Sequence, residues 1–177
     1  ESPESVAVRL SNRRTGVGAD GIVLILPSKR ADAKMRMFNA DGTESTVAGN
    51  ALRCVCKYLY ETGRVRKEEM RIETGSGVKA AKLFIREDQV FSVLVDMGRP
   101  AFAPADVPVK LDGEKVLSRR VYLAGQMREI SCVSMGNPHC IVFVKDPDQI
   151  DVAQVGTMLE NHPIFPKRAN IEFVQVV

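Results

Sequence analysis

The chain has 177 residues, of which 45% are hydrophobic and 27% charged, and its formal net charge is +3. This is the composition of a globular protein with one domain or two small ones. Scattered basic residues and an aromatic content of only 6% argue against a nucleic-acid partner, and no apolar run approaches the roughly 20 residues of a membrane span.

Short runs rich in Val, Ile and Phe alternate with turn signals, which predicts mainly β-strands. In chain order, the expected strands are Gly21–Leu26, Lys34–Asn39, Glu69–Thr74, Val78–Arg86, Val90–Asp96, Arg128–Ser134, Cys140–Lys145 and Ile171–Val176. Glu87-Asp88-Gln89 is expected to form a tight connection between two of them, giving an antiparallel hairpin.

Two helices are expected. The first spans Gly49–Glu61, and its buried face consists of Leu52, Val55, Cys56 and Leu59 at i, i+3, i+4 and i+7. The second spans Asp151–Asn161, with Val152, Val155 and Leu159 pointing inward.

The pattern M-G-x-P follows a strand twice, at 97–100 and 135–138, which hints at an internal duplication. A Pro-rich span, Pro100 to Pro108, suits a hinge. We therefore predict an α+β fold with one central helix per unit, divided into residues 1–97 and 98–177. The second unit has few strands to cover its helix, so we expect more chain or a partner to complete it.

The N-terminal residues, Glu1 to Ser5, lack the basic start and the apolar segment of a secretion signal. The absence of an initiator Met indicates a trimmed chain or a missing start. Four cysteines at 54, 56, 132 and 140 show no C-x-x-C spacing, and there are only two histidines. We therefore expect no metal site, free thiols and a cytoplasmic location.

The segment around the first helix contains the first candidate site. A helix that begins at Gly49 offers unpaired N–H groups and the positive end of its dipole, which can hold a carboxylate. Asn39 and Asn50 bracket this position with side-chain amides. Each segment alone is typical of a turn or a helix cap, but together they favour a binding site. The residue at the opening is Ala48, which can do no acid–base chemistry.

A second candidate group lies later in the chain. Asn137-Pro138-His139 is either a plain loop or an amide contact to a ligand, with His139 orienting a catalytic group or relaying a proton. Asn170 begins a strand and alone would be a turn residue. Cys54 and Cys140 are predicted to be core residues rather than nucleophiles.

Residues 16–21 spell G-x-G-x-x-G but precede a strand. A dinucleotide-binding loop follows a strand, so we reject that site.

Six segments, taken in order, carry a more specific pattern: residues 15–21, 37–44, 49–54, 95–98, 133–140 and 160–174. N-A-D-G-T-E followed by G-N, and then M-G-N-P-H, resemble the diaminopimelate epimerase family. The resemblance implies two similar α+β halves, each a curved sheet around a central helix, of which the second is incomplete here. It also implies a cofactor-free isomerase that interconverts LL- and meso-diaminopimelate in lysine and peptidoglycan precursor synthesis.

In that family one cysteine thiolate removes the α-proton and a second cysteine returns a proton to the opposite face. Helix openings suit this chemistry because they lower a thiol pKa and stabilise negative charge on the substrate. Carried over residue by residue, the resemblance implies substrate binding by Asn39, Gly49, Asn50, Asn137 and Asn170, with His139 supporting proton transfer. Ala48 occupies the position of the first catalytic cysteine.

The chain departs from the family pattern in three places. First, the family has a cysteine, usually preceded by a methionine, where this chain has Val47-Ala48. Second, the other catalytic cysteine and a Glu-Arg pair are expected beyond Val177. Third, the family's opening segment is missing. We therefore expect the chain as printed to be inactive, through an engineered Cys→Ala change, natural divergence or an incomplete sequence.

Two alternatives stay open. One is a related amino-acid racemase or isomerase, and the other is a catalytically dead amino-acid-binding paralogue. The expected partner is a small amino acid, and a homodimer is one possible assembly.

Overall fold

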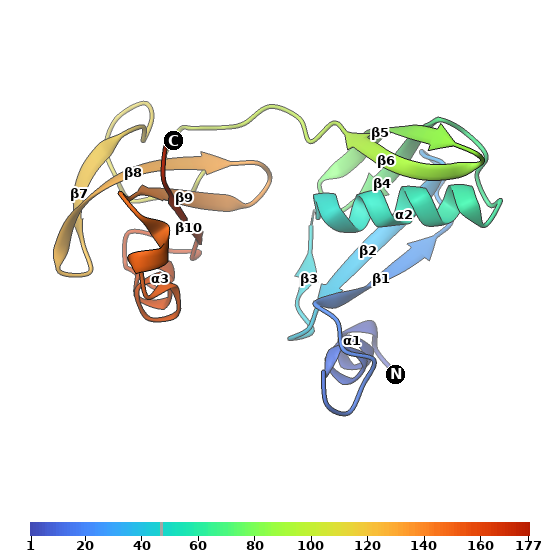
Figure 1. Cartoon of the computed structure of the whole chain (residues 1–177), viewed down its shortest axis with the longest axis horizontal. Coiled ribbons are helices and arrows are strands. Elements are labelled where there is room, and N and C mark those ends of the chain that lie inside the picture. The colour runs from blue at the N-terminus through green and yellow to red at the C-terminus, as the bar shows by residue number, and fades with distance from the viewer. Residues whose placement is uncertain (47) are drawn as a thin grey trace. The chain divides into compact units, whose positions relative to one another are not determined.

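The computed structural model describes residues 1–46 and 48–177, so Val47, the first half of the Val47-Ala48 departure, lies outside the described residues. The chain divides into two compact units, Glu1–Met97 and Gly98–Val177 (Figure 1). Each unit has its own cluster of buried apolar side chains. Each therefore has the separate core that an independently folding domain needs.

The described residues of the first unit form two helices and a six-stranded sheet. Its elements are α1 (Pro3–Ser11), β1 (Gly21–Leu26), β2 (Ala33–Asn39), β3 (Glu44–Ser45), α2 (Gly49–Glu61), β4 (Glu69–Thr74), β5 (Gly77–Arg86) and β6 (Gln89–Val95). The strands lie in the order β1-β2-β4-β5-β6, and β3 pairs with β2. Among the described strands of this unit, β2 and β4 form the one parallel pair. Helix α2 lies between them in the sequence and provides the crossover connection that a parallel pair requires.

Helix α2 lies across one face of this sheet (Figure 1). Its four predicted inward residues, Leu52, Val55, Cys56 and Leu59, are all buried, which confirms the predicted helical face. They pack with sheet residues such as Met35 and Ile72. The helix is thus fixed by its apolar stripe, and that packing determines where its first turn lies.

The β5–β6 hairpin has the tight connection predicted for it, but Gln89, predicted to lie in the connection, is the first residue of β6. Arg86 pairs with Gln89, and the two residues between them, Glu87 and Asp88, have φ values of 50° and 61°. Two successive left-handed residues form a type I′ turn, whose twist matches that of the flanking strands.

Helix α1 is absent from the sequence-based prediction, which was wrong in expecting two helices only. Its start has a recognisable signal: Ser2 Oγ accepts a hydrogen bond from Ser5 N at 3.3 Å, and Pro3 occupies the first turn. The helix packs on β1 and β2 and buries Ala7. Its β-branched residues, Val6 and Val8, weaken its intrinsic helix propensity, so packing on the sheet decides its formation.

The rejected G-x-G-x-x-G segment connects α1 to β1. A Cβ added at Gly16 would lie 2.4 Å from Arg9 O, and one added at Gly21 would lie 2.3 Å from Phe38 O. Glycine is therefore needed at both positions because another stretch of backbone passes close by. The segment precedes β1, in agreement with the rejection of a dinucleotide site.

The second unit has a four-stranded sheet in the order β10-β9-β8-β7. Its elements are β7 (Arg119–Leu123), β8 (Gln126–Ser134), β9 (Pro138–Phe143), a short 3-10 helix η1 (Pro147–Gln149), α3 (Val152–Glu160) and β10 (Asn170–Val174). Strands β9 and β10 pair in parallel, joined through α3, which packs on β10 (Figure 1). The prediction missed β7 and wrongly placed Val152 inward: its exposed fraction is 54%, whereas Leu159 is fully buried.

Both units combine a curved sheet with few helices, which confirms the predicted α+β class. Among residues 1–46 and 48–177, no helix has both the length and the apolar character required to cross a bilayer.

Candidate active site

The turn after β2 orients Asn39. Its side-chain Nδ2 donates to Thr43 Oγ1 at 2.9 Å, and its backbone N–H donates to Thr43 O at 2.8 Å. Asp41 holds the turn by accepting from Thr43 N at 2.9 Å and Thr43 Oγ1 at 2.6 Å. The hydrogen bond from the Thr43 hydroxyl lowers the pKa of Asp41. The turn thus fixes the Asn39 amide by local hydrogen bonds, as N-A-D-G chemistry predicts.

Helix α2 begins without a capping side chain. Ala48 is its N-cap residue, has extended backbone angles (φ −146°, ψ 101°), and makes no side-chain cap bond. Ala48 O accepts the first helical bond, from Leu52 N at 2.9 Å. The first turn contains no acidic residue, so its N–H groups and the helix dipole are available to an anion. Ala48 itself is half-buried.

The next two residues complete this opening. A Cβ added to Gly49 would lie 3.4 Å from Met97 Sδ, so the glycine keeps the backbone close to that side chain. Asn50 Oδ1 accepts a hydrogen bond from Arg53 Nη2, one helical turn further along. This contact gives Arg53 a structural role in orienting the exposed Asn50 amide.

The second unit brings together the three residues predicted there. His139 Nε2 lies 3.0 Å from Asn137 Oδ1, and Asn170 Nδ2 donates to Pro138 O at 3.0 Å. Asn170 is also the parallel register partner of His139. Two segments that are distant in sequence therefore meet at the start of β9 and β10.

A fourth residue of this cluster, Glu172, was not predicted. Its Oε1 lies 2.7 Å from His139 Nδ1. A signal for it exists in the sequence, because side chains at i and i+2 of a strand share a face, and Glu172 follows Asn170 by two residues.

The candidate residues are divided between the two units. Asn39, Ala48, Gly49 and Asn50 belong to the first unit, and Asn137, His139 and Asn170 belong to the second. Both groups present amides, and the first adds a helix opening, so each can bind polar or anionic groups of a small zwitterion. The described residues contain no cluster of three or more His, Cys, Asp or Glu that could hold a metal ion.

The thiols occupy different environments. Cys56, Cys132 and Cys140 are buried, and burial raises the pKa of Cys56 to about 12. The core position predicted for Cys140 is confirmed. Cys54 is exposed, so its predicted core position was wrong: it falls between the buried rows of α2, two residues from both Leu52 and Cys56.

A sequence model of diaminopimelate epimerase matches residues 1–103 and 131–177. The chain belongs to the diaminopimelate epimerase family. The diaminopimelate epimerase of Acetivibrio thermocellus is 45% identical to it, over the whole chain and 63% of that relative. That of Desulfovibrio desulfuricans is 46% identical, over the whole chain and 64% of its own length. The chain therefore spans a little under two thirds of these family members, and the recognition made from its motifs is confirmed.

Among solved structures, a Bacillus anthracis phenazine biosynthesis protein of the PhzF family has a TM-score of 0.56 to the chain, with 22% sequence identity. The match covers 98% of this chain and 56% of that protein. A likeness at this level of identity concerns the fold, and it agrees with the α+β class.

Proposed function

We propose that the protein from which this chain comes is a diaminopimelate epimerase, an isomerase that interconverts the LL and meso forms of its substrate. Identities of 45% and 46% to such enzymes over the whole chain support this proposal. The structural observation that carries it is the uncapped start of α2 at residue 48. That opening can neutralise a substrate carboxylate while negative charge develops at the adjacent carbon.

In this proposal Gly49 donates a backbone N–H, and Asn39 and Asn50 provide amides from the first unit. Asn137 and Asn170 provide amides from the second unit, and His139 supports proton transfer. Two cysteines exchange the α-proton from opposite faces in this mechanism. Ala48 occupies the first of these positions, and the second is expected beyond Val177.

The half-buried methyl group of Ala48 can neither take nor give a proton, so a chain with this residue should bind substrate without two-base epimerisation. This observation favours one other function, that of an amino-acid-binding paralogue which keeps the site but lacks turnover. The two functions differ in chemistry at the α-carbon, whereas binding is common to both.

We also propose the domain organisation, the cellular location and the assembly of the enzyme. Residues 1–97 would form the first epimerase domain and 98–177 the first part of the second. The enzyme would act in the cytoplasm without a cofactor, and a homodimer is one possible assembly.

The test is deuterium incorporation in the full-length protein. We would incubate it with LL-diaminopimelate in D₂O and follow the α-position by NMR. Deuterium uptake with inversion supports the epimerase. Saturable binding without exchange is the result that Ala48 predicts for either function, and the Ala48→Cys variant then separates them; absence of both contradicts diaminopimelate as the substrate.

The Ala48→Cys variant of the full-length protein tests the placement of the site. Restoring an acid–base group should raise turnover about 100-fold or more, because the new thiol would lie at a helix opening that favours the thiolate. Cys54→Ala is the matched control, since its thiol lies on the exposed helix surface and should not affect exchange. No gain in the Ala48→Cys variant would contradict this site.

A further inference from the structure

His139 is held at both ring nitrogens. Nδ1 lies 2.7 Å from Glu172 Oε1, and Nε2 lies 3.0 Å from Asn137 Oδ1. The other carboxylate oxygen, Glu172 Oε2, is buried and has no hydrogen-bond partner among the described residues. Among the described residues, the Glu172 carboxylate therefore forms its hydrogen bond with His139.

Strand pairing fixes this arrangement. Asn170 is in register with His139, and its side chain donates to Pro138 O at 3.0 Å. Glu172 follows on the same face of β10, opposite Ile141. The Glu172 carboxylate thus reaches the His139 imidazole from the neighbouring strand. The register of the two strands is set by their backbone pairing and by the hydrogen bond from the Asn170 side chain.

The two contacts have different consequences for the proton. An ionised carboxylate only accepts hydrogen bonds, so Nδ1 must carry a hydrogen to donate to Glu172. The hydrogen bond made by one ring nitrogen determines the state of the other. In the neutral ring, Nε2 is then an acceptor, which pairs with Asn137 when the amide turns its Nδ2 toward the ring. In the protonated ring, Nε2–H can donate to Asn137 Oδ1.

We propose that Glu172 is a positioning residue that keeps Nδ1 of His139 protonated, so that His139 exchanges its proton only at Nε2, the nitrogen beside Asn137. A proton arriving from a ligand or from water forms the Nε2–H bond, and the same bond breaks when the proton leaves. No electrons are transferred. The use of this exchange in catalysis rests on the proposed function, but the tautomer does not.

The test is ¹⁵N NMR of the chain labelled at its histidine side chains. Only His139 and His162 are present, so His162→Gln assigns both sets of signals. His162 Nδ1 accepts from Ile164 N at 3.4 Å, so this residue should show the opposite tautomer and serve as an internal reference. For His139 we expect a protonated Nδ1 and, in the neutral ring, an unprotonated Nε2.

Glu172→Ala should abolish the single tautomer and give a mixture of both for His139, with the His162 signals unchanged. Glu172→Gln retains a carbonyl acceptor and should preserve Nδ1–H better than alanine does. The matched control is Glu160→Gln, whose carboxylate lies on α3 and pairs with Arg168 at 3.7 Å; it should leave His139 unchanged.

An unprotonated Nδ1 in the wild-type chain, or identical His139 signals in folded wild-type and Glu172→Ala chains, would overturn the proposal. Circular dichroism and the His162 signals report on folding, and Glu172→Gln provides the comparison if the alanine variant unfolds. Because this readout needs no substrate, its failure is distinguishable from failure of the diaminopimelate proposal, which the D₂O experiment measures.

Discussion

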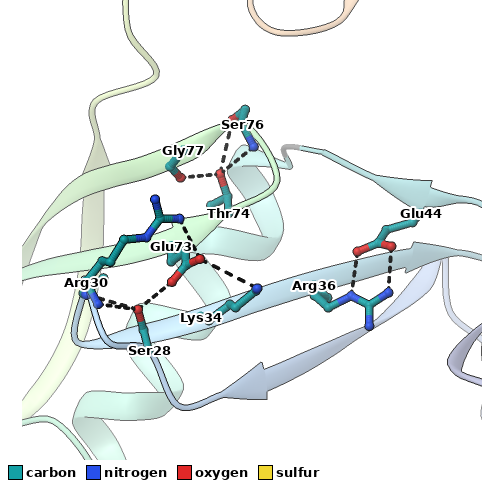
Figure 2. A network of polar contacts seen from close by, with 10 residues as sticks. Ser28, Arg30, Lys34, Arg36, Glu44, Glu73, Thr74, Ser76 and Gly77 are labelled. Atoms are coloured by element: carbon teal, nitrogen blue, oxygen red, sulfur yellow. Dashed lines mark hydrogen bonds and ion pairs between the residues drawn. The ribbon is translucent and has the colours of Figure 1, made fainter.

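Arg30 donates from Nη2 to Glu73 Oε1 at 2.7 Å and thereby ties the segment between β1 and β2 to strand β4 (Figure 2). Ser28 Oγ donates to the other carboxylate oxygen at 2.6 Å, and it accepts from the backbone N–H groups of Arg30 and Ala31. The Glu73 side chain is only 12% exposed. The connection is therefore anchored by one carboxylate with both oxygens occupied.

This carboxylate should make stability depend on pH. Hydrogen bonds from Arg30 and then Ser28 lower the pKa of Glu73 from 4.5 to about 2. Because the folded pKa lies below the unfolded one, the stabilisation is present above pH 4.5 and is lost as pH falls from about 4.5 to about 2. Glu73→Gln should lower the free energy of unfolding at pH 7, and the difference from wild type should shrink over that window.

Urea denaturation at a series of pH values measures this difference. Glu69→Gln is the control, since Glu69 is an exposed residue of the same strand. Parallel pH profiles for wild type and Glu73→Gln would contradict the assigned role.

Thiol labelling should distinguish Cys54 from the other cysteines. Cys54 is exposed, whereas Cys56, Cys132 and Cys140 are buried and out of reach of a reagent in solution; burial also raises the pKa of Cys56. A brief treatment of the native chain with iodoacetamide should modify Cys54 alone, and treatment in urea should modify all four. Peptide mass spectrometry locates the label; fast native labelling of Cys56 would contradict the packing of α2.

The core of the first unit depends on Leu52, which is fully buried in α2. Leu52→Ala should cost about 2–5 kcal/mol through lost burial and a residual cavity. Leu94→Ala is the matched control, because Leu94 is 62% exposed on β6, and surface changes usually stay within about 0.5 kcal/mol. Chemical denaturation compares the two, and equal effects would show that α2 does not pack as described.

Local patterns predicted the regular elements well. The bounds expected for β1, α2 and β4 agree with those in the structure, because periodic apolar residues and clear turn signals fix them. Helix α1 and strand β7 were missed, since packing on neighbouring strands supports them more than their own sequence does. Cys54 was predicted to be buried, but it lies two residues from both Leu52 and Cys56 and therefore off the buried face of α2.

The candidate site was predictable as a set of residues but not as a set of contacts. Asn137, His139 and Asn170 come from motif resemblance, and the structure adds that they meet at the paired starts of β9 and β10. The contact between Glu172 and His139 depends on a parallel register between distant segments. No local periodicity encodes such a register, so only the folded chain reveals it.

The bare first turn of α2 also affects how occupancy can be detected. An anion seated there would satisfy amides that the empty protein leaves to water, and a ligand that binds only the native state raises the melting temperature. A rise in melting temperature would then report that the site is occupied, even though Ala48 can neither accept nor donate a proton. Under the proposed function, an active epimerase would show amino-acid binding and hydrogen exchange together, whereas a protein with Ala48 would show binding alone.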